Sequence, residues 1–111
     1  MIGENKVKNL WKFGLLAAAI GFAGQAAADE NLAMKSGCLA CHKVDVKLVG
    51  PSYKDIAAKY KDQEGAQEML TESVIKGSVN KWGPVPMPAK GGRADVSDED
   101  IGKIVAWILT Q

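Results

Sequence analysis

The chain has 111 residues, of which 47% are hydrophobic and 24% are charged, and its formal net charge is +1. This length and composition fit one globular domain and exclude a larger multi-domain organisation. The near balance of charge gives no electrostatic reason to expect binding to nucleic acid or to the bulk membrane surface.

The first 28 residues have the pattern of a secretory signal peptide. Lys6, Lys8 and Lys12 form a basic start, the apolar run FGLLAAAIGFA follows, and small residues end at Ala28. An uncleaved anchor helix is the alternative, but a membrane span needs about 20 apolar residues and this run is shorter. We therefore predict that residues 1–28 are cleaved and that a domain of residues 29–111 is exported to the periplasm without stable membrane insertion.

The exported segment is expected to fold as an all-α domain of about four helices. The first expected helix covers residues 29–41 and begins with acidic residues, and a short second helix follows the break at Gly50-Pro51. A third helix is expected over residues 64–76, with Gly77 ending it. Apolar residues at helical spacing support the second helix: Tyr53, Ile56, Ala57 and Tyr60.

The stretch VNKWGPVPMPAKGGRAD then interrupts the helical pattern. Its alternating Pro84, Pro86 and Pro88 exclude a helix and predict an extended, stiff path. The last helix has the clearest signals, because Ser97 can cap its start and Asp100 stands three residues later. One apolar stripe at helical spacing follows: Ile101, Ile104, Val105, Ile108 and Leu109.

Both cysteines and the only histidine lie together in GCLACHK, as Cys38, Cys41 and His42. A structural zinc site usually needs four ligands, a redox dithiol usually follows a strand, and a disulfide here closes too small a loop to stabilise a domain much. Cys-x-x-Cys-His is instead the attachment pattern of c-type haem, in which the histidine binds iron. We therefore predict one haem c bound covalently through Cys38 and Cys41, with His42 as an iron ligand.

The second axial ligand of the iron follows by elimination among the methionines of the exported segment. Met34 lies one turn before the attachment site on the same expected helix, and Met69 falls on the apolar stripe of the third helix, where core packing is usual. Met87 stands in the proline-rich stretch, outside secondary structure. Ligation of iron by Met87 is favoured, since a thioether is a recognised partner to histidine in cytochromes c; packing into a gap is the alternative.

Three stretches, GCLACHKVDVKLVGPSYKDIAAKY, KWGPVPMPAK and VSDEDIGKIVAWILT, together resemble the small bacterial class I cytochromes c. The resemblance is to the short monohaem type that serves nitrite reductase and terminal oxidases. It implies the class I cytochrome c fold, with about four helices wrapped around one covalent haem, a proline-rich distal loop and His42/Met87 ligation. It also implies that the Pro51 carbonyl accepts a hydrogen bond from His42, and that the Trp82 indole donates one to a haem propionate.

Two features depart from this resemblance. Relatives often carry a side-chain amide three residues after the ligand methionine, where this chain has Lys90, and the loop continues through residues 91–95, longer than in the shortest relatives. An arginine that anchors a propionate in some relatives is also missing near Ser73. Lys76 and Arg93 are the two candidates to replace it.

These features predict a periplasmic one-electron carrier rather than an enzyme, because two protein ligands leave iron no open position. Its expected partners are periplasmic redox proteins: nitrite reductase, a terminal oxidase, or a quinol-oxidising complex as donor. The chain is expected to be a monomer. Two alternatives remain, a haem-based ligand sensor in which Met87 is displaced and a haem-free thiol–disulfide protein. Lysines near the haem-binding segments form either a weak docking rim for an acidic partner or ordinary solvated surface: Lys35, Lys43, Lys47, Lys81 and Lys90.

Overall fold

The computed structural model describes residues 29–111, so the expected signal peptide of residues 1–28 lies outside the described residues. The described part is helical, and its β-pairing is limited to one isolated bridge between Ser78 and Met87. No helix in this part is long and apolar enough to cross a membrane. The predicted all-α class is confirmed.

The first predicted helix over residues 29–41 is broken in the structure. Residues 29–35 are helical, the chain then turns, and a short 3₁₀ helix, η1 (Cys38–Ala40), follows. Gly37 separates the two with a φ of +81°, a left-handed conformation that glycine adopts without steric cost. The expectation of one continuous helix was therefore wrong, and Cys38 begins a separate tight turn.

Two helices, α2 (Tyr53–Tyr60) and α4 (Asp98–Ile108), begin with serine caps. The Ser52 and Ser97 hydroxyl oxygens each accept a hydrogen bond from the backbone N–H three residues on, at 3.1 Å. Such a cap satisfies a donor that the helix itself cannot pair and contributes about 1 kcal/mol. The cap predicted at Ser97 is confirmed.

Helix α3 (Ala66–Lys76) is bounded by two glycines with positive φ. Gly65 precedes it with φ +76°, and Gly77 ends it with φ +81° and ψ 170°. The helix begins two residues later than expected because the chain still turns at residues 64–65. Its predicted end at Gly77 is confirmed.

Buried side chains form two clusters, and α4 contributes to both of them. Each large apolar side chain that is removed from water contributes about 1.5–3 kcal/mol. The predicted stripe of α4 is confirmed, but Trp107, which is only 4% exposed, was missed. The first cluster contains Tyr60, Ala66, Leu70, Val96, Ile101 and Val105. The second contains Ala33, Tyr53, Ile104, Trp107 and Ile108.

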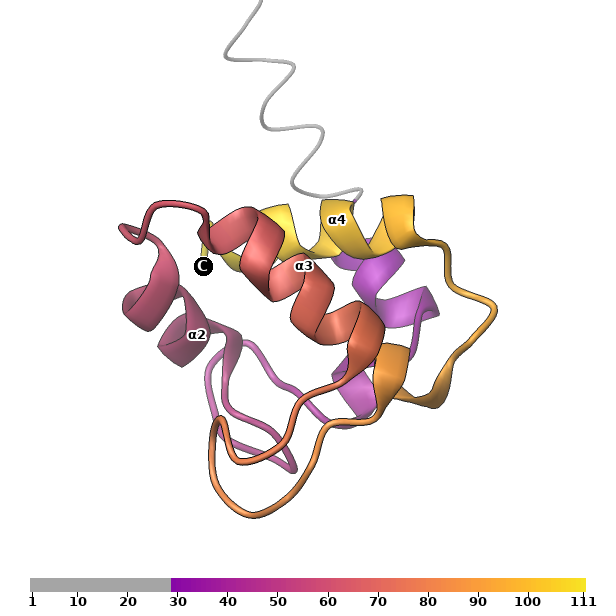
Figure 1. Cartoon of the computed structure of the whole chain (residues 1–111), viewed down its shortest axis with the longest axis horizontal. Helices are drawn as coiled ribbons and strands as arrows, with labels where there is room; N and C mark the ends of the chain where they lie inside the picture. Colours follow the sequence, from indigo (N-terminus) through magenta and orange to yellow (C-terminus); the bar gives the residue numbers. More distant parts are fainter. Residues whose placement is uncertain (1–28) are drawn as a thin grey trace, which may run out of the picture.

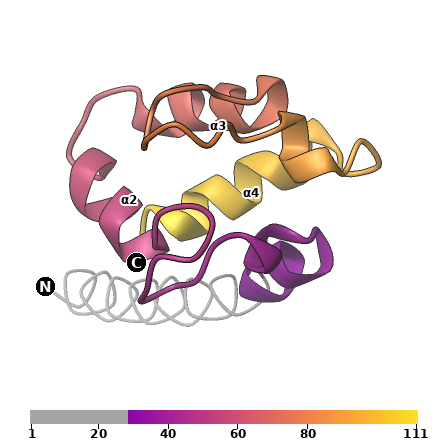
Figure 2. The same ribbon diagram turned by 90° about the horizontal axis from the view of Figure 1, so that it is seen from below.

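The helices hold two long loops at one end of the molecule. In Figure 1, α3 crosses in front of α4, α2 lies at one side, and the loops of residues 41–50 and 78–88 extend below them. The view from below shows these two loops on different sides of the molecule, with α4 running between the layers that carry them (Figure 2). The space between the loops is the cavity described next.

Candidate functional site

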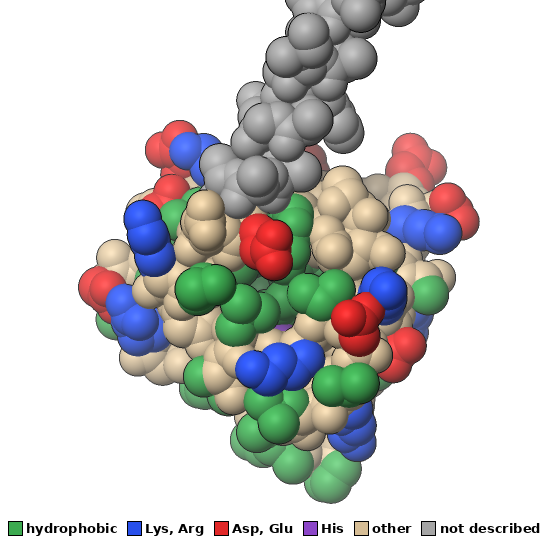
Figure 3. All heavy atoms as spheres, turned by 180° about the vertical axis from the view of Figure 1, so that it is seen from behind, with side chains coloured by type: hydrophobic (Ala, Val, Ile, Leu, Met, Phe, Trp, Pro, Cys, Tyr) green, Lys and Arg blue, Asp and Glu red, His purple; other side chains and the backbone are tan. Residues whose placement is uncertain are grey.

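A cavity is lined by the η1 turn, both long loops and helices α2, α3 and α4. Most of its wall is apolar. Among residues 29–111, the charged side chains in the wall are Lys47, Lys81 and Lys90, and no Asp or Glu contributes to it. Seen from behind, the single histidine appears as a small area between hydrophobic side chains (Figure 3). This wall fits an apolar ligand that carries negative charge.

His42 has a defined orientation in this cavity. Its Nδ1 lies 2.8 Å from the Pro51 carbonyl oxygen, and because a carbonyl only accepts, Nδ1 carries the proton and donates it. The ring also stacks on Tyr53, with centroids 5.3 Å apart and planes 18° apart. In the neutral imidazole the hydrogen bond to Pro51 leaves the lone pair on the other ring nitrogen, Nε2, which can then bind a metal.

Gly50 makes room for the His42 ring. Its N–H donates to the Cys41 carbonyl at 2.8 Å, which closes the loop back onto the cysteine turn. A Cβ at position 50 would lie only 2.8 Å from His42 Nδ1 and closer still to Cε1, so any side chain there would displace the ring. The sequence pattern identified Gly50 as a helix break and missed this packing role.

The two cysteines lie in the cavity wall and are not joined by a disulfide, with Cys38 half-buried and Cys41 exposed. The turn between them is fixed by the Cys38 carbonyl, which accepts from the N–H groups of Cys41 (3.3 Å) and His42 (3.0 Å). Burial raises the pKa of the Cys38 thiol. Within residues 29–111 no group of three or more His, Cys, Asp or Glu side chains is close enough to hold a metal ion.

Of the methionines among residues 29–111, Met87 alone lines the cavity. Met34 is 59% exposed, and Met69 packs against the core cluster of α3 and α4, as the sequence predicts. The backbone of Met87 is held by two hydrogen bonds with Ser78, of 3.0 and 2.8 Å. This pairing was not expected, since nothing in the proline-rich stretch alternates like a strand. It fixes the backbone of Met87, whereas the direction of the Met87 side chain depends on the residues that pack around it.

Trp82 also lines the cavity and is 39% exposed. Its ring meets Tyr60 edge to face, with centroids 6.3 Å apart, and the Lys59 ammonium lies 4.7 Å from the Trp82 ring centre. These contacts fix the indole at the rim of the cavity, where the N–H remains available to a ligand.

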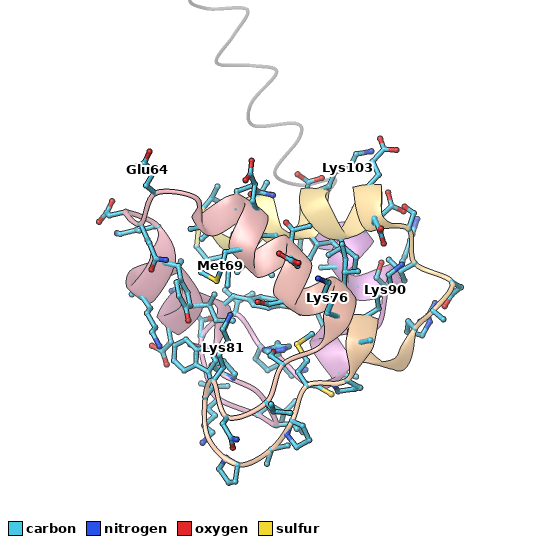
Figure 4. The ribbon with its side chains drawn as sticks, viewed as in Figure 1. Glu64, Met69, Lys76, Lys81, Lys90 and Lys103 are labelled. Carbon is cyan, nitrogen blue, oxygen red and sulfur yellow. The ribbon has the colours of Figure 1, made fainter. Side chains whose placement is uncertain are left out.

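The cation beside Ser73 in the cavity wall is Lys81, which differs from the two that the sequence suggested. Lys76 and Arg93 each pair with a carboxylate close in sequence, and neither lines the cavity. Lys81 does line it, and its ammonium donates to Ser73 Oγ at 2.7 Å and to the Met69 sulfur at 3.3 Å (Figure 4). Both of these acceptors are neutral. One sign of the position of Lys81 is present in the sequence, because Lys81 directly precedes Trp82, but the prediction from sequence did not use it.

The Tyr53 hydroxyl is a buried polar atom in the wall, and it has no hydrogen-bond partner among the described residues. Burial, reinforced by the neighbouring Cys38 thiol, raises the pKa of Tyr53 well above its ordinary value. Unpaired buried hydroxyls are rare in folded proteins. Its position fits a cavity whose wall is completed by a bound group.

Comparison with known proteins gives one consistent result. The family model described as "Cytochrome c" matches residues 23–111. A cytochrome c-552 from Nitrosomonas europaea is 44% identical over 104 residues, covering 94% of this chain and 98% of that protein. A cytochrome c-551 from Pseudomonas aeruginosa is 44% identical over 82 residues, covering 74% of this chain and 75% of that protein. The crystal structure of wild-type Nitrosomonas europaea cytochrome c552 superposes with a TM-score of 0.68 at 46% identity, covering 73% of this chain and 96% of that one.

Proposed function

The chain belongs to the cytochrome c family, electron-transfer proteins that carry covalent haem c, and from this premise we propose that it is a periplasmic one-electron carrier with His42 and Met87 as axial ligands. The composition of the cavity supports this proposal most directly. Both cysteines, His42 and Met87 line one apolar space, and they come from two loops that are far apart in sequence. No other methionine of residues 29–111 reaches it.

The residues of the cavity fit the cofactor that this family binds. Cys38 and Cys41 would bind it covalently, and the apolar wall would exclude water. Lys47 and Lys81, together with the absence of acidic side chains among the described wall residues, suit a ring that carries two carboxylates, whereas the ammonium of Lys90 is already paired with Asp98. We assign Trp82 and Lys81 to those carboxylates, the first by its indole N–H and the second by its ammonium.

His42 and Pro51 prepare the proximal side. The Pro51 carbonyl accepts a hydrogen bond from Nδ1–H, so the Nε2 lone pair would be available to the haem iron, and this contact would hold the imidazole in one orientation in both oxidation states. When bound with histidine and methionine ligands, haem supplies reversible one-electron transfer at a raised potential. Because both ligands come from a packed protein, little has to move when the electron is exchanged.

Electron exchange requires a surface at which a partner can approach the cavity. The tips of the two loops carry a group of exposed apolar side chains next to it, and Lys47 and Lys81 flank the opening. We propose that this face meets periplasmic redox proteins, with apolar contact at the centre and lysines that favour an acidic partner. Lys90 does not belong to this rim, since its side chain is only 18% exposed and is paired. The exposed apolar side chains are Val46, Leu48, Val49, Val79 and Val85.

We also propose that the chain is exported and cleaved at its N-terminal segment. The basic and apolar pattern of residues 1–28 directs export and cleavage, after which residues 29–111 bind the cofactor in the periplasm as a monomer. Nitrite reductase, a terminal oxidase and a quinol-oxidising complex are the proposed partner classes. Mass spectrometry of the exported protein would test the boundary directly: the mass must equal residues 29–111 plus one haem.

The ligation is tested by the visible spectra of the holoprotein and of two methionine variants. The wild type is expected to show sharp low-spin bands when reduced, a weak red band of ferric methionine ligation, and haem that survives denaturation. Met87→Ala should lose the red band and bind carbon monoxide when reduced, whereas Met69→Ala should keep the red band. Carbon monoxide binding by the wild type would favour the sensor alternative. A wild type without haem and with both thiols open to alkylation would refute the proposal and favour the thiol alternative.

A further inference from the structure

Lys90 is an unusual residue in the loop that carries Met87. Its backbone is left-handed, with φ +52°, a conformation that non-glycine residues rarely adopt. Its side chain is only 18% exposed although it carries a charge. Both features cost free energy, so the contacts of the ammonium group must offset them.

Those contacts reach the start of α4. The Lys90 ammonium donates to the Val96 carbonyl oxygen at 2.7 Å and pairs with Asp98 Oδ1 at 2.9 Å. Figure 4 shows Lys90 beside this end of α4, well apart from Lys81. The side chain of Lys90 therefore joins the Met87 loop to a rigid helix of the core.

The same contacts bridge the base of the loop extension in residues 91–95. The backbone turns twice there, with Arg93 N–H donating to the Lys90 carbonyl at 3.1 Å and Val96 N–H donating to the Arg93 carbonyl at 3.1 Å. Gly91 and Gly92 both have positive φ. A Cβ at either glycine would meet nothing within 4 Å, so little packing restrains this segment between Met87 and α4.

Met87 lies between two restraints. On its N-terminal side its backbone is hydrogen-bonded to Ser78. On its C-terminal side the nearest side-chain restraint is Lys90, three residues later. This stretch is also held by a hydrogen bond from Gly91 N–H to the Pro88 carbonyl at 3.0 Å and by contact of residues 89–92 with α3, and Lys90 is the residue that ties it to α4.

We propose that Lys90 is a positioning residue, whose clamp onto Val96 and Asp98 isolates Met87 from the loop extension and keeps its sulfur at the iron. The inference rests on the proposed His42/Met87 ligation. The clamp acts through the backbone of the loop, whereas a side-chain amide at this position would act on the sulfur directly. The two departures from the family pattern, the lysine and the longer loop, thereby compensate for one another.

The test measures the apparent affinity of the ferric holoprotein for imidazole, which displaces Met87 from the iron. Loss of the red band reports the displacement. Apparent affinity for an external ligand rises with the fraction of molecules in which methionine has left iron. For Lys90→Ala we expect a roughly three- to tenfold tighter apparent affinity, the range for losing a partly buried charged contact. Alanine also disfavours a positive φ, so this variant removes the side-chain contacts without relieving the backbone.

Two matched variants isolate the clamp. Glu99→Ala removes another acid from the first turn of α4, one whose pairing with Lys103 is looser, at 3.7 Å, and exposed; imidazole affinity should stay within about twofold of wild type. Asp98→Ala should tighten imidazole binding, and combining it with Lys90→Ala should add little, because both remove the same contact. Equal imidazole affinity in Lys90→Ala and Glu99→Ala would overturn the inference.

A loop insertion provides a second measurement that does not depend on the stability of Lys90→Ala. One glycine inserted after Gly92 should leave imidazole affinity of the otherwise wild-type protein unchanged, because the clamp bridges the base of the extension. A tighter affinity in that protein would overturn the clamp while the wild-type red band still supports the ligation. A wild type without the red band would refute the His42/Met87 proposal itself.

Discussion

The two sides of the cavity are built around glycines that do different things. Gly50 leaves space for the His42 side chain, whereas Gly77 leaves space for the Met87 backbone, since a Cβ there would lie 2.8 Å from the Met87 carbonyl oxygen. Contacts of the ring itself fix the histidine, because it donates a hydrogen bond to Pro51 and stacks on Tyr53. The methionine is fixed only as far as its main chain. In the proposed carrier, the proximal side is therefore fixed by side-chain contacts of His42, and the distal side depends on how well the backbone of the Met87 loop is held.

The largest effect is expected from Gly77→Ala. The φ of +81° and ψ of 170° at Gly77 belong to a region that is essentially restricted to glycine, and the new Cβ would meet backbone rather than a movable side chain. Strain and overlap together should lower the free energy of unfolding by roughly 3 kcal/mol. Chemical denaturation of the holoprotein measures this, together with loss of the red band.

Gly65→Ala is the matched control for this variant. Gly65 has a comparable φ of +76° but open space around the site of a Cβ. Its cost should be limited to strain, about 1 kcal/mol. Equal losses for the two variants would show that contact with the Met87 backbone carries no weight.

Gly50→Ala should have the next largest effect and should act on the proximal side. The backbone at Gly50 is unstrained, so the cost comes from overlap with the His42 ring, about 2 kcal/mol. Moving the ring also weakens the hydrogen bond to Pro51, so the reduction potential should change along with stability. Gly102→Ala, with open space at a helix position, should instead stabilise by about 0.5–1 kcal/mol. An unchanged potential in Gly50→Ala would contradict the idea that side-chain contacts of His42 fix the proximal side.

Lys81→Ala should change the potential with little change in fold. Removing a cation that faces the cavity favours the oxidised, more positive form, so the potential should fall by the equivalent of less than about 1 kcal/mol. Protein-film voltammetry measures the shift, which should shrink in high salt. Lys103→Ala, on α4 and outside the cavity wall, serves as the comparison and should leave the potential nearly constant. A larger drop in the reduction potential of Lys103→Ala than in that of Lys81→Ala would contradict the assignment of Lys81 to the haem carboxylates.

The smallest effect concerns the thiols before the haem is attached. Burial raises the pKa of Cys38, and only a thiolate reacts quickly, so Cys38 of the apoprotein should stay protonated to higher pH than an ordinary thiol. At neutral pH its alkylation should be slower than that of exposed Cys41, on the order of threefold or more, and should keep accelerating as pH increases. Peptide mapping after timed alkylation distinguishes the two sites. Faster labelling of Cys38 would contradict its burial in the wall.

Local signals in the sequence were sufficient for much of the fold. Ser97 predicted a helix start, Gly77 predicted a helix end, and the apolar stripe predicted the buried face of α4, because each depends on neighbours within one or two turns. The break at Gly37 was missed because a glycine in an apolar helical pattern does not reveal its φ. Trp107 was missed because its contacts come from Tyr53 in another helix.

Only the part of the candidate site whose residue spacing is typical of a known cofactor-binding pattern could be predicted from the sequence. Cys38, Cys41 and His42 form a pattern within five residues, and elimination leaves Met87. The Ser78 bridge, the packing role of Gly50 and the contacts of Lys81 and Lys90 depend on segments brought together by the tertiary fold. A single sequence carries no local sign of such contacts, and they are the ones that hold the cavity in shape.

The bridge between Ser78 and Met87 has a consequence for how this surface can diversify. It closes the base of a loop whose residues 79–86 are all exposed. Substitutions at the two exposed valines of this loop, Val79 (71% exposed) and Val85 (62% exposed), can alter its outer surface while the bridge holds the Met87 backbone. In the proposed carrier, the outer surface of this loop can therefore diversify while the backbone of the ligand methionine stays fixed.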